Sequence, residues 1–515
     1  MTVRNLLFVM CDQLRADHLS CYGHPRLATP SLDALAARGA RFENAFVQSG
    51  VCGPSRMSFY TGRYVSSHGA TWNRVPLSIA EWTLGDHLRA AGRELTLIGK
   101  THVMPDRGGL ARFGLDGASE LGELLARGSF VEALRHDGHH AEPQARYADW
   151  LRAHGYAGDD PWTDYVIGVT DGAGRVRSGW EMRNCRWPAR VAEPHSETAY
   201  TTDQALEFIR AQGERPWALH LSYVKPHWPY VAPAPYHALY GAADALPVRR
   251  DPAELVDPHP VLAAYRRQEE CANFARDEVI AAVRPAYMGL VRQIDDHLGR
   301  IWRLLDELGR WEDTLVVFTS DHGDFLGDHW LGEKEHFFDT AQRVPLIVAA
   351  PGAVAGRRVE ALVEAIDVVP TVLAAFGLPA ARHRVEGRSL LPWLAGEPPR
   401  AWRDAVFSEL DWSYREARRT LGREPDRCHA WMVRTADWKY AHWLDLPPQL
   451  FDLRADPDEF HDLGRVPALE ARRQEMRARL FDWFCGLKRR TTVALEEVEQ
   501  GTAAHKRAGV FFGQW

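Results

Sequence analysis

A short motif near the amino terminus holds the residues best suited to chemistry. Residues 52–56 read C-G-P-S-R, and a Gly-Arg pair follows at 62–63. Proline is favoured in the first turn of a helix, so Cys52 is predicted to lie at or just before a helix N-terminus. The partial positive charge and free N–H groups there stabilise an anionic nucleophile and an anionic substrate. Arg56 would lie one turn further, close enough to hold an oxygen. A buried structural cysteine would explain a lone Cys, but the extended pattern is far rarer by chance.

Two pairs of polar residues are candidate metal ligands. Asp12 and Gln13 follow one apolar run, and Asp321 and His322 follow another. Two carboxylates, an amide oxygen and an imidazole suit one divalent cation, Mn²⁺ or Ca²⁺. A structural zinc site would instead need thiolates or several imidazoles. Asp12 alone could be a helix cap or turn residue, whereas a polar motif directly after an apolar strand is harder to explain in that way.

Four basic residues are candidates for handling charge and protons. Lys100 and His102 follow a predicted strand, His227 follows another, and Lys334 lies in a charged turn near the metal motif. The lysines can neutralise charge that builds up on a transferred sulfuryl or phosphoryl group. The histidines can move protons near neutral pH. Any one of these residues alone would be interpreted as a solvated surface residue, so their positions are what single them out.

The apolar pattern predicts the elements that must position these residues. Short apolar runs alternate with amphipathic stretches, which is typical of a sheet with helices on its faces. In an open α/β sheet, ligands bind outside the carboxyl ends of the strands, where these polar residues fall. Strands are predicted at 5–10, 95–99, 217–223, 314–319 and 344–349, and helices at 30–39, 82–91, 197–212 and 285–308.

Two structural units are expected from the length of 515 residues. The catalytic unit is predicted to span 1–395, with insertions near 105–195 and 250–284. A smaller C-terminal unit with a tail spans 396–515. Within it the pattern predicts short hairpin strands and one helix, at 430–434, 438–443, 449–453 and 467–487.

Composition narrows the functional classes. A net charge of −7 gives no broad basic surface for nucleic acid or an anionic membrane. No apolar run reaches the roughly 18 residues of a membrane-spanning helix. The seven irregularly spaced cysteines suggest no disulfide framework, and the short segment before Asp12 lacks a secretory pattern, so a cytoplasmic location is expected. The aromatic tail at 511–515 is predicted to dock on a neighbouring subunit, which favours a homo-oligomer.

Together these motifs resemble the type I sulfatases of the alkaline phosphatase superfamily, over nearly the whole chain. The resemblance implies a large α/β domain around a mixed sheet, followed by a smaller α+β domain with a short antiparallel sheet. It implies that a maturation system oxidises Cys52 to formylglycine, whose hydrate is the nucleophile. One divalent metal ion would be held by an oxygen of that residue together with Asp12, Gln13, Asp321 and His322.

The same resemblance implies roles for the remaining candidates. Arg56 would steady the hydrate, and Lys100 and His102 match a K-x-H motif that binds the hydrate and assists its breakdown. His227 and Lys334 would bind the sulfate and help the leaving oxygen depart. One hydroxyl of the hydrate would attack sulfur and expel the alcohol; the other, deprotonated by His102, would collapse to the aldehyde and eject sulfate.

Two departures point toward a particular branch of the family. Many sulfatases carry a second Asp where this chain has Gln13, and the D-Q-L-R-A-D form at 12–17 is closer to phosphonate monoester hydrolases and choline sulfatases. The segment 438–453 is especially like the phosphonate monoester hydrolases. Those enzymes, however, carry Tyr and Thr in place of Lys100 and His102. Alignment with the same group implies that Asn73 contacts the substrate, although an exposed turn residue is the simpler interpretation of this Asn.

Three functions follow as hypotheses. The first is hydrolysis of aryl or other small sulfate monoesters, with promiscuous activity. The second is hydrolysis of phosphonate monoesters and phosphodiesters at the same site, since both substrate classes present one negative charge and a tetrahedral centre. The third is a non-catalytic, metal-stabilised oligomer, for which at least one motif should be broken; none is.

Overall fold

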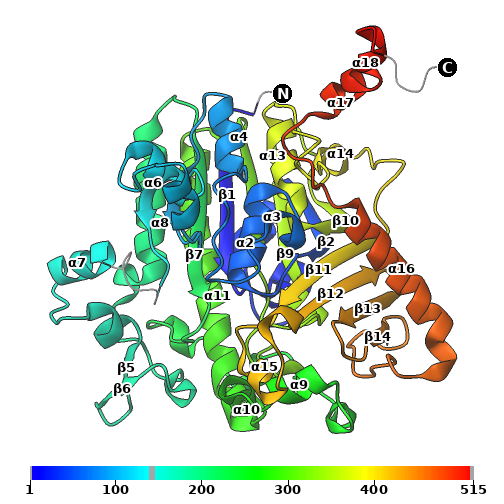
Figure 1. The fold of residues 1–515 in the computed structure, drawn as a ribbon. Helices are drawn as coiled ribbons and strands as arrows, with labels where there is room; N and C mark the ends of the chain where they lie inside the picture. The colour runs from blue at the N-terminus through cyan, green and yellow to red at the C-terminus, as the bar shows by residue number, and fades with distance from the viewer. Residues whose placement is uncertain (1–2, 139–144, 511–515) are drawn as a thin grey trace.

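The computed structural model describes residues 3–138 and 145–510, and its centre is a mixed sheet with the strand order β10-β2-β9-β8-β1-β7-β3-β4 (Figure 1). Strand β9 runs antiparallel to β2 and β8, and the other neighbours are parallel. The strands are β1 (Asn5–Asp12), β2 (Ala40–Phe46), β3 (Thr96–Gly99), β4 (Val131–Arg135), β7 (Ala218–Pro226), β8 (Thr314–Ser320), β9 (Arg343–Ala349) and β10 (Arg357–Glu364).

Four of these strands lie side by side and parallel in the order β8-β1-β7-β3. They correspond to four of the strands predicted from apolar runs. Leu7 of β1 pairs with Val316 of β8 on one side and with Leu219 of β7 on the other. Because the four strands are parallel and in register, the polar residues that follow them emerge at one edge of the sheet.

Both faces of the sheet are covered by helices, so β1 is buried on both sides. Its residues alternate between two apolar cores: Leu7 and Val9 pack in one, and Leu6 and Phe8 pack in the other. The first core is shared with α1 (Pro30–Arg38), α8 (Glu197–Gln212) and α11 (Asp277–Glu307), and the second with α2 (Cys52–Thr61), α4 (Leu84–Ala90) and α13 (Val368–Ala375).

Two segments differ from the sequence-based expectation. Helix α11 begins at Asp277, upstream of Pro285, because Val279, Ile280 and Val283 extend its buried face in that direction. The segment 105–195 was expected to be an insertion, yet its strand β4 pairs with β3 and forms an edge of the large sheet. The same segment contains α5 (Arg107–Arg112), α6 (Glu120–Ala126), α7 (Ala145–Ala153), β5 (Gly168–Thr170) and β6 (Val176–Ser178).

A smaller antiparallel sheet follows, which confirms the predicted fold class (Figure 1). Its strands are β11 (Ala405–Asp411), β12 (His429–Thr435), β13 (Trp438–Trp443) and β14 (Gln449–Asp452), and α16 (Glu470–Gly486) packs against it. The hairpin strands were predicted, and β11 was not. The boundary at residue 395 stays a prediction, and the aromatic tail at 511–515 lies outside the described residues.

The remaining helices are short, and α17 and α18 extend away from the body of the molecule (Figure 1). None of the helices in the described ranges has both the length and the apolar character that a bilayer crossing requires. All seven cysteines lie in these ranges and are free thiols. The short helices are α3 (Val65–His68), α9 (Pro260–Tyr265), α10 (Glu269–Phe274), α12 (Asp339–Gln342), α14 (Leu391–Leu394), α15 (Glu416–Thr420), α17 (Leu495–Gly501) and α18 (Ala504–Arg507).

Candidate active site

Cys52 is the first residue of α2 and lies beside the carboxyl ends of β1 and β8. Pro54 falls in the first turn, where a helical N–H has no partner in the helix, so proline is tolerated there. The Cys52 Sγ lies 3.0 Å from Nε2 of His322 and 4.0 Å from Oδ1 of Asp12. The thiol therefore faces the residues that follow the two central strands.

Asp12, Cys52, Asp321 and His322 form a buried group whose possible ligand atoms all lie within 4.8 Å of one another. His322 Nε2 is 3.7 Å from Asp12 Oδ1 and 3.6 Å from Asp321 Oδ1. Ca²⁺–oxygen bonds of about 2.4 Å at right angles would place neighbouring ligands about 3.4 Å apart. Nδ1 of His322 donates to the Gly323 carbonyl at 2.8 Å, which leaves Nε2 facing the group. These residues fit a divalent cation.

Gln13 connects this group to Lys334. Its backbone is left-handed (φ 67°), and its N–H donates to Asp321 Oδ1 at 3.0 Å. Its side-chain Nε2 donates to Asp324 Oδ2 at 2.5 Å, while its Oε1 accepts from Lys334 Nζ at 3.1 Å. Tyr230 also donates to Asp324 Oδ2, at 2.6 Å. The amide oxygen of Gln13 therefore lies beside the lysine.

Arg56 and Lys100 hold the two carboxylates of the metal group. Arg56 Nε donates to Asp321 Oδ2 at 2.7 Å, and its Nη1 donates to the Lys100 carbonyl and to Ser222 Oγ, each at 2.9 Å. Lys100 Nζ lies 2.5 Å from Asp12 Oδ2. Arg56 therefore binds a ligand carboxylate together with a backbone carbonyl and a serine hydroxyl, and Lys100 is paired with the other carboxylate.

His227 and Lys334 form a second polar pair beside Gln13. Nδ1 of His227 donates to the Trp228 carbonyl at 2.8 Å, so its Nε2 accepts from Lys334 Nζ at 3.0 Å. Both side chains are buried. Lys334 is therefore linked to the candidate metal ligands by Gln13, which contacts both Lys334 and Asp321.

The last two predicted residues, Asn73 and His102, lie in the loops that follow α3 and β3. Oδ1 of Asn73 accepts the Gly53 N–H at 2.7 Å, so Asn73 is anchored to the start of α2. A Cβ at Gly53 would lie 2.9 Å from that oxygen, which explains why the smallest residue stands there. His102 lies in the loop after β3, half-buried, with a left-handed backbone (φ 59°).

Burial and charge together set the protonation of these groups. Burial raises the pKa of Asp12, but the positive charges of Lys100 and Arg56 lower it by more, so its net pKa lies well below the usual range. Burial and the neighbouring Lys334 hold the pKa of His227 well below its usual value, which favours the neutral imidazole. For His322, burial lowers the pKa, yet Asp321 and the Cys52 thiol raise it to about 9.

Sequence reasoning missed the residues that support the candidates. Asp324 and Tyr230 fix the Gln13 amide, Ser222 holds Arg56, and Ser55 Oγ donates to the Asp321 carbonyl at 2.5 Å. Two signals were available: Ser55 is part of the cysteine motif, and Asp324 continues the D-H-G motif by one residue. Tyr230 and Ser222 carried no such signal.

Comparisons with known proteins identify the family of this chain. The Sulfatase family model matches residues 4–378, and the model for the C-terminal part of N-sulphoglucosamine sulphohydrolase matches 327–484. The multifunctional alkaline phosphatase superfamily protein PehA of Trinickia caryophylli is 34% identical over 97% of this chain and 99% of its own. The choline-sulfatase of Rhizobium meliloti (strain 1021) is 30% identical over 90% of this chain and 83% of its own.

The solved structures give the same result. The phosphonate monoester hydrolase SpPMH from Silicibacter pomeroyi superposes with a TM-score of 0.83 at 32% identity, covering 95% of this chain and 96% of that one. The family model spans most of the chain, and the full-length relatives share its fold. This chain therefore belongs to the sulfatase family of hydrolases, within the alkaline phosphatase superfamily.

Proposed function

We propose that this protein hydrolyses sulfate monoesters, aryl esters among them, with a formylglycine hydrate made from Cys52 as the nucleophile. One observation carries the proposal: the Cys52 Sγ, within a C-x-P-S-R motif, lies against His322 and Asp12 at the start of α2. That sulfur marks the position where an oxygen of the hydrate would lie. A formylglycine-generating maturation system would be the partner that makes the conversion.

Asp12, Gln13, Asp321 and His322 would hold one cation, Ca²⁺ or Mn²⁺. A divalent cation supplies a Lewis acid that draws charge from the oxygens of a sulfate and favours a deprotonated nucleophile. Arg56 and Lys100 keep the two carboxylates in place and offset their charge. Gln13 adds an oxygen that Asp324 and Lys334 orient from either end of the amide.

The remaining residues would manage the charge and protons of the ester. The hydrate would supply one hydroxyl to attack sulfur, which expels the alcohol, and a second hydroxyl whose deprotonation would let the aldehyde form again with release of sulfate. His102 would accept that second proton. Lys334, which donates to the neutral His227, would stabilise the oxygen that leaves with the alcohol. Asn73, anchored at Gly53, would contact the substrate beside the start of α2.

A second candidate function is hydrolysis of phosphonate monoesters and phosphodiesters at the same site. Its support is the close likeness to SpPMH, a phosphonate monoester hydrolase, together with Gln13 in place of a second Asp. Both substrate classes carry one negative charge around a tetrahedral centre, so the site's charge discriminates little between them. Lys100, which pairs with Asp12, stands at a position where the phosphonate monoester hydrolases carry Tyr. This difference favours sulfate esters as the preferred substrates.

Mass spectrometry of the peptide that contains Cys52 tests the nucleophile. A loss of about 18 Da relative to cysteine would mark the aldehyde. Turnover of 4-nitrophenyl sulfate should scale with the converted fraction, and Cys52→Ala should abolish it. An unmodified thiol in protein that still releases sulfate would show that the nucleophile is wrong. Exclusive turnover of 4-nitrophenyl phenylphosphonate would replace the first function with the second.

A further inference from the structure

A row of aromatic rings leads from His227 to the protein surface. The ring centroids of His227 and Trp228 lie 4.7 Å apart, those of Trp228 and Trp180 lie 5.5 Å apart, and those of Trp180 and Trp162 lie 6.1 Å apart. Trp228 is half-buried, and Trp180 is 43% exposed. The exposed indole of Trp180 therefore contacts Trp228, which in turn contacts His227.

The position of Trp180 is fixed by the fold. It follows Gly179, whose N–H donates to the Ile167 carbonyl at 2.8 Å. A Cβ at Gly179 would collide with that carbonyl, so the chain passes this point in close backbone contact. At the far side, buried Trp162 donates its indole N–H to Glu197, near the start of α8, at 2.9 Å. The exposed ring of Trp180 therefore lies between the hydrogen-bonded backbone of Gly179 and the hydrogen-bonded indole of Trp162.

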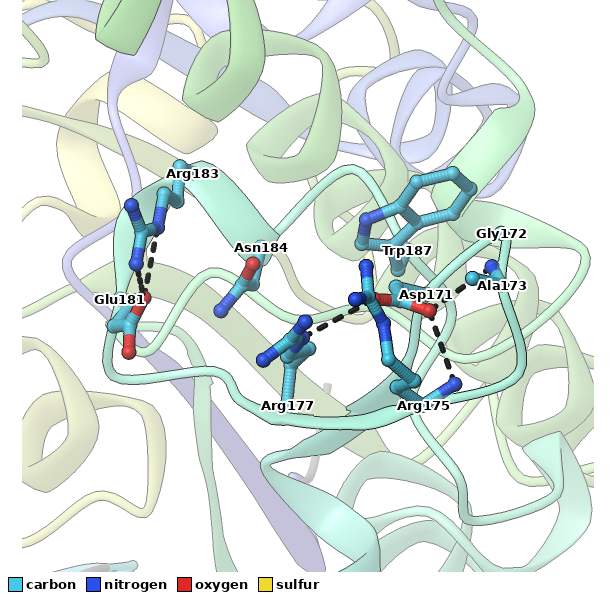
Figure 2. Close-up of a pocket in the computed structure, with 9 residues that line it drawn as sticks. All are labelled: Asp171, Gly172, Ala173, Arg175, Arg177, Glu181, Arg183, Asn184 and Trp187. Atoms are coloured by element: carbon cyan, nitrogen blue, oxygen red, sulfur yellow. Dashed lines mark hydrogen bonds and ion pairs between the residues drawn. The ribbon is translucent and has the colours of Figure 1, made fainter.

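The hairpin β5–β6, which precedes Trp180, and the residues after it carry several arginines (Figure 2). An open hollow of about 460 Å³ lies beside the hairpin and the residues that follow it. Among its lining residues, drawn in Figure 2, Asp171 accepts from Arg175 and Arg177, and Glu181 pairs with Arg183. Those pairs tie the turn together. Over 171–190 the chain has five arginines against two acids. The surroundings of Trp180 therefore disfavour a cationic ligand.

We propose that Trp180 and Trp228 form the aromatic wall of the subsite for the leaving group, and that the preferred substrates are esters of aromatic alcohols. The inference rests on the function proposed above. The leaving oxygen would depart on the side of Lys334 and His227, so the group bound to it extends toward Trp228 and Trp180. Aromatic rings associate at centroid separations of about 4.5–7 Å, a spacing that a phenyl group can adopt against these indoles.

The test compares Trp180→Ala with Trp180→Phe and with Trp82→Ala. Trp82 is a matched control because it is 41% exposed and its ring contacts His87 of α4. Helix α4 lies toward the opposite end of the sheet from the hairpin β5–β6 (Figure 1). For 4-nitrophenyl sulfate, Trp180→Ala should lower kcat/KM about tenfold, chiefly through KM, while ethyl sulfate should change by less than about twofold. Trp180→Phe should retain most of the activity, and Trp82→Ala all of it.

A binding measurement keeps the outcomes distinguishable. 4-Nitrobenzenesulfonate has no ester oxygen to release, so its quenching of tryptophan fluorescence reports binding without turnover. Its affinity should fall about tenfold in Trp180→Ala and stay unchanged in Trp82→Ala. Equal losses for the aryl and ethyl esters, unchanged sulfonate affinity, or a larger loss for choline sulfate than for the aryl ester would each overturn the inference. A wild-type protein that binds the sulfonate through Trp180 but cleaves no ester would instead refute the proposed function.

Discussion

At the scale of single residues, Asp324 determines where the Gln13 amide points. Its Oδ2 accepts from both Gln13 Nε2 and Tyr230 OH, and its Oδ1 accepts from the Leu326 N–H at 3.0 Å. A carboxylate can accept at both oxygens, whereas a carboxamide must turn its NH₂ toward one of these donors. The orientation of Gln13, and with it the contact to Lys334, therefore depends on the carboxylate of Asp324, which was not among the predicted site residues.

Asp324→Asn should reduce kcat/KM for sulfate ester hydrolysis by roughly 10–100-fold, the usual cost of losing a residue that orients a metal ligand. The loss should diminish as the concentration of added Ca²⁺ or Mn²⁺ is raised, because Gln13 would bind the cation more weakly. Steady-state kinetics across a metal titration measure both effects. Tyr230→Phe is the matched control, since it removes one donor and leaves the carboxylate in place. Full activity of Asp324→Asn without added metal would contradict the assigned role of Gln13.

At the scale of elements, the start of α2 depends on the close approach of the Asn73 loop. A Cβ at Gly53 would lie 2.9 Å from Asn73 Oδ1 and 3.0 Å from its Cα, so Gly53→Ala must displace that loop. We expect a loss of about 1–3 kcal/mol in the free energy of unfolding and a clear rise in KM.

Gly486→Ala provides the control for this substitution. Gly486 ends α16, and nothing lies within 4 Å of its Cβ position. Alanine is favoured over glycine in helices by about 0.5–1 kcal/mol, so this variant should be as stable as the wild type or more so. Denaturant unfolding measures the free energy of unfolding of both variants, and steady-state kinetics measure their KM. A Gly53→Ala protein with unaltered KM would show that Asn73 does not depend on this contact.

The strands that could be predicted are those with continuous apolar runs. β1 and β8 are buried along their whole length, and each contains a continuous apolar run (L-L-F-V-M in β1 and L-V-V-F in β8) that is easily found. β2 (A-R-F-E-N-A-F), β4 (V-E-A-L-R) and β10 (R-R-V-E-A-L-V-E) lie toward the ends of the sheet and are only partly buried. Their mixed polar character hid them, because partly exposed strands need only some apolar residues.

The candidate site was predictable to the extent that polar residues follow strands. Asp12 and Asp321 could be paired from sequence because parallel neighbours end at the same edge. Tyr230 and Trp180 could not be found in this way, since each reaches its position through a loop whose path depends on packing. The contact between Trp180 and Trp228 joins two segments with no shared sequence pattern.

At the scale of the whole molecule, buried acids lie where the two sheets meet. Glu364, at the end of β10, accepts from Tyr64 OH at 2.8 Å and from the Phe407 N–H of β11 at 2.9 Å. Glu409 of β11 accepts from the Ser66 N–H at 2.8 Å. Burial raises the pKa of each carboxyl group to about 7. The junction therefore holds protons that the unfolded chain would release.

Because of these two carboxyl groups, the free energy of unfolding should decrease as the pH rises from about 4.5 to about 7. A folded pKa of about 7 against an ordinary value near 4.5 means that the native state binds more protons between those values, so the stabilisation is complete below about pH 4.5 and lost above 7. Glu409→Gln cannot ionise, so relative to wild type its free energy of unfolding should rise by roughly 2–3 kcal/mol between pH 5 and pH 8. Urea denaturation at the two pH values measures this difference, with exposed Glu496→Gln as the control. Parallel pH profiles for Glu409→Gln and wild type would show that Glu409 ionises without cost where the sheets meet.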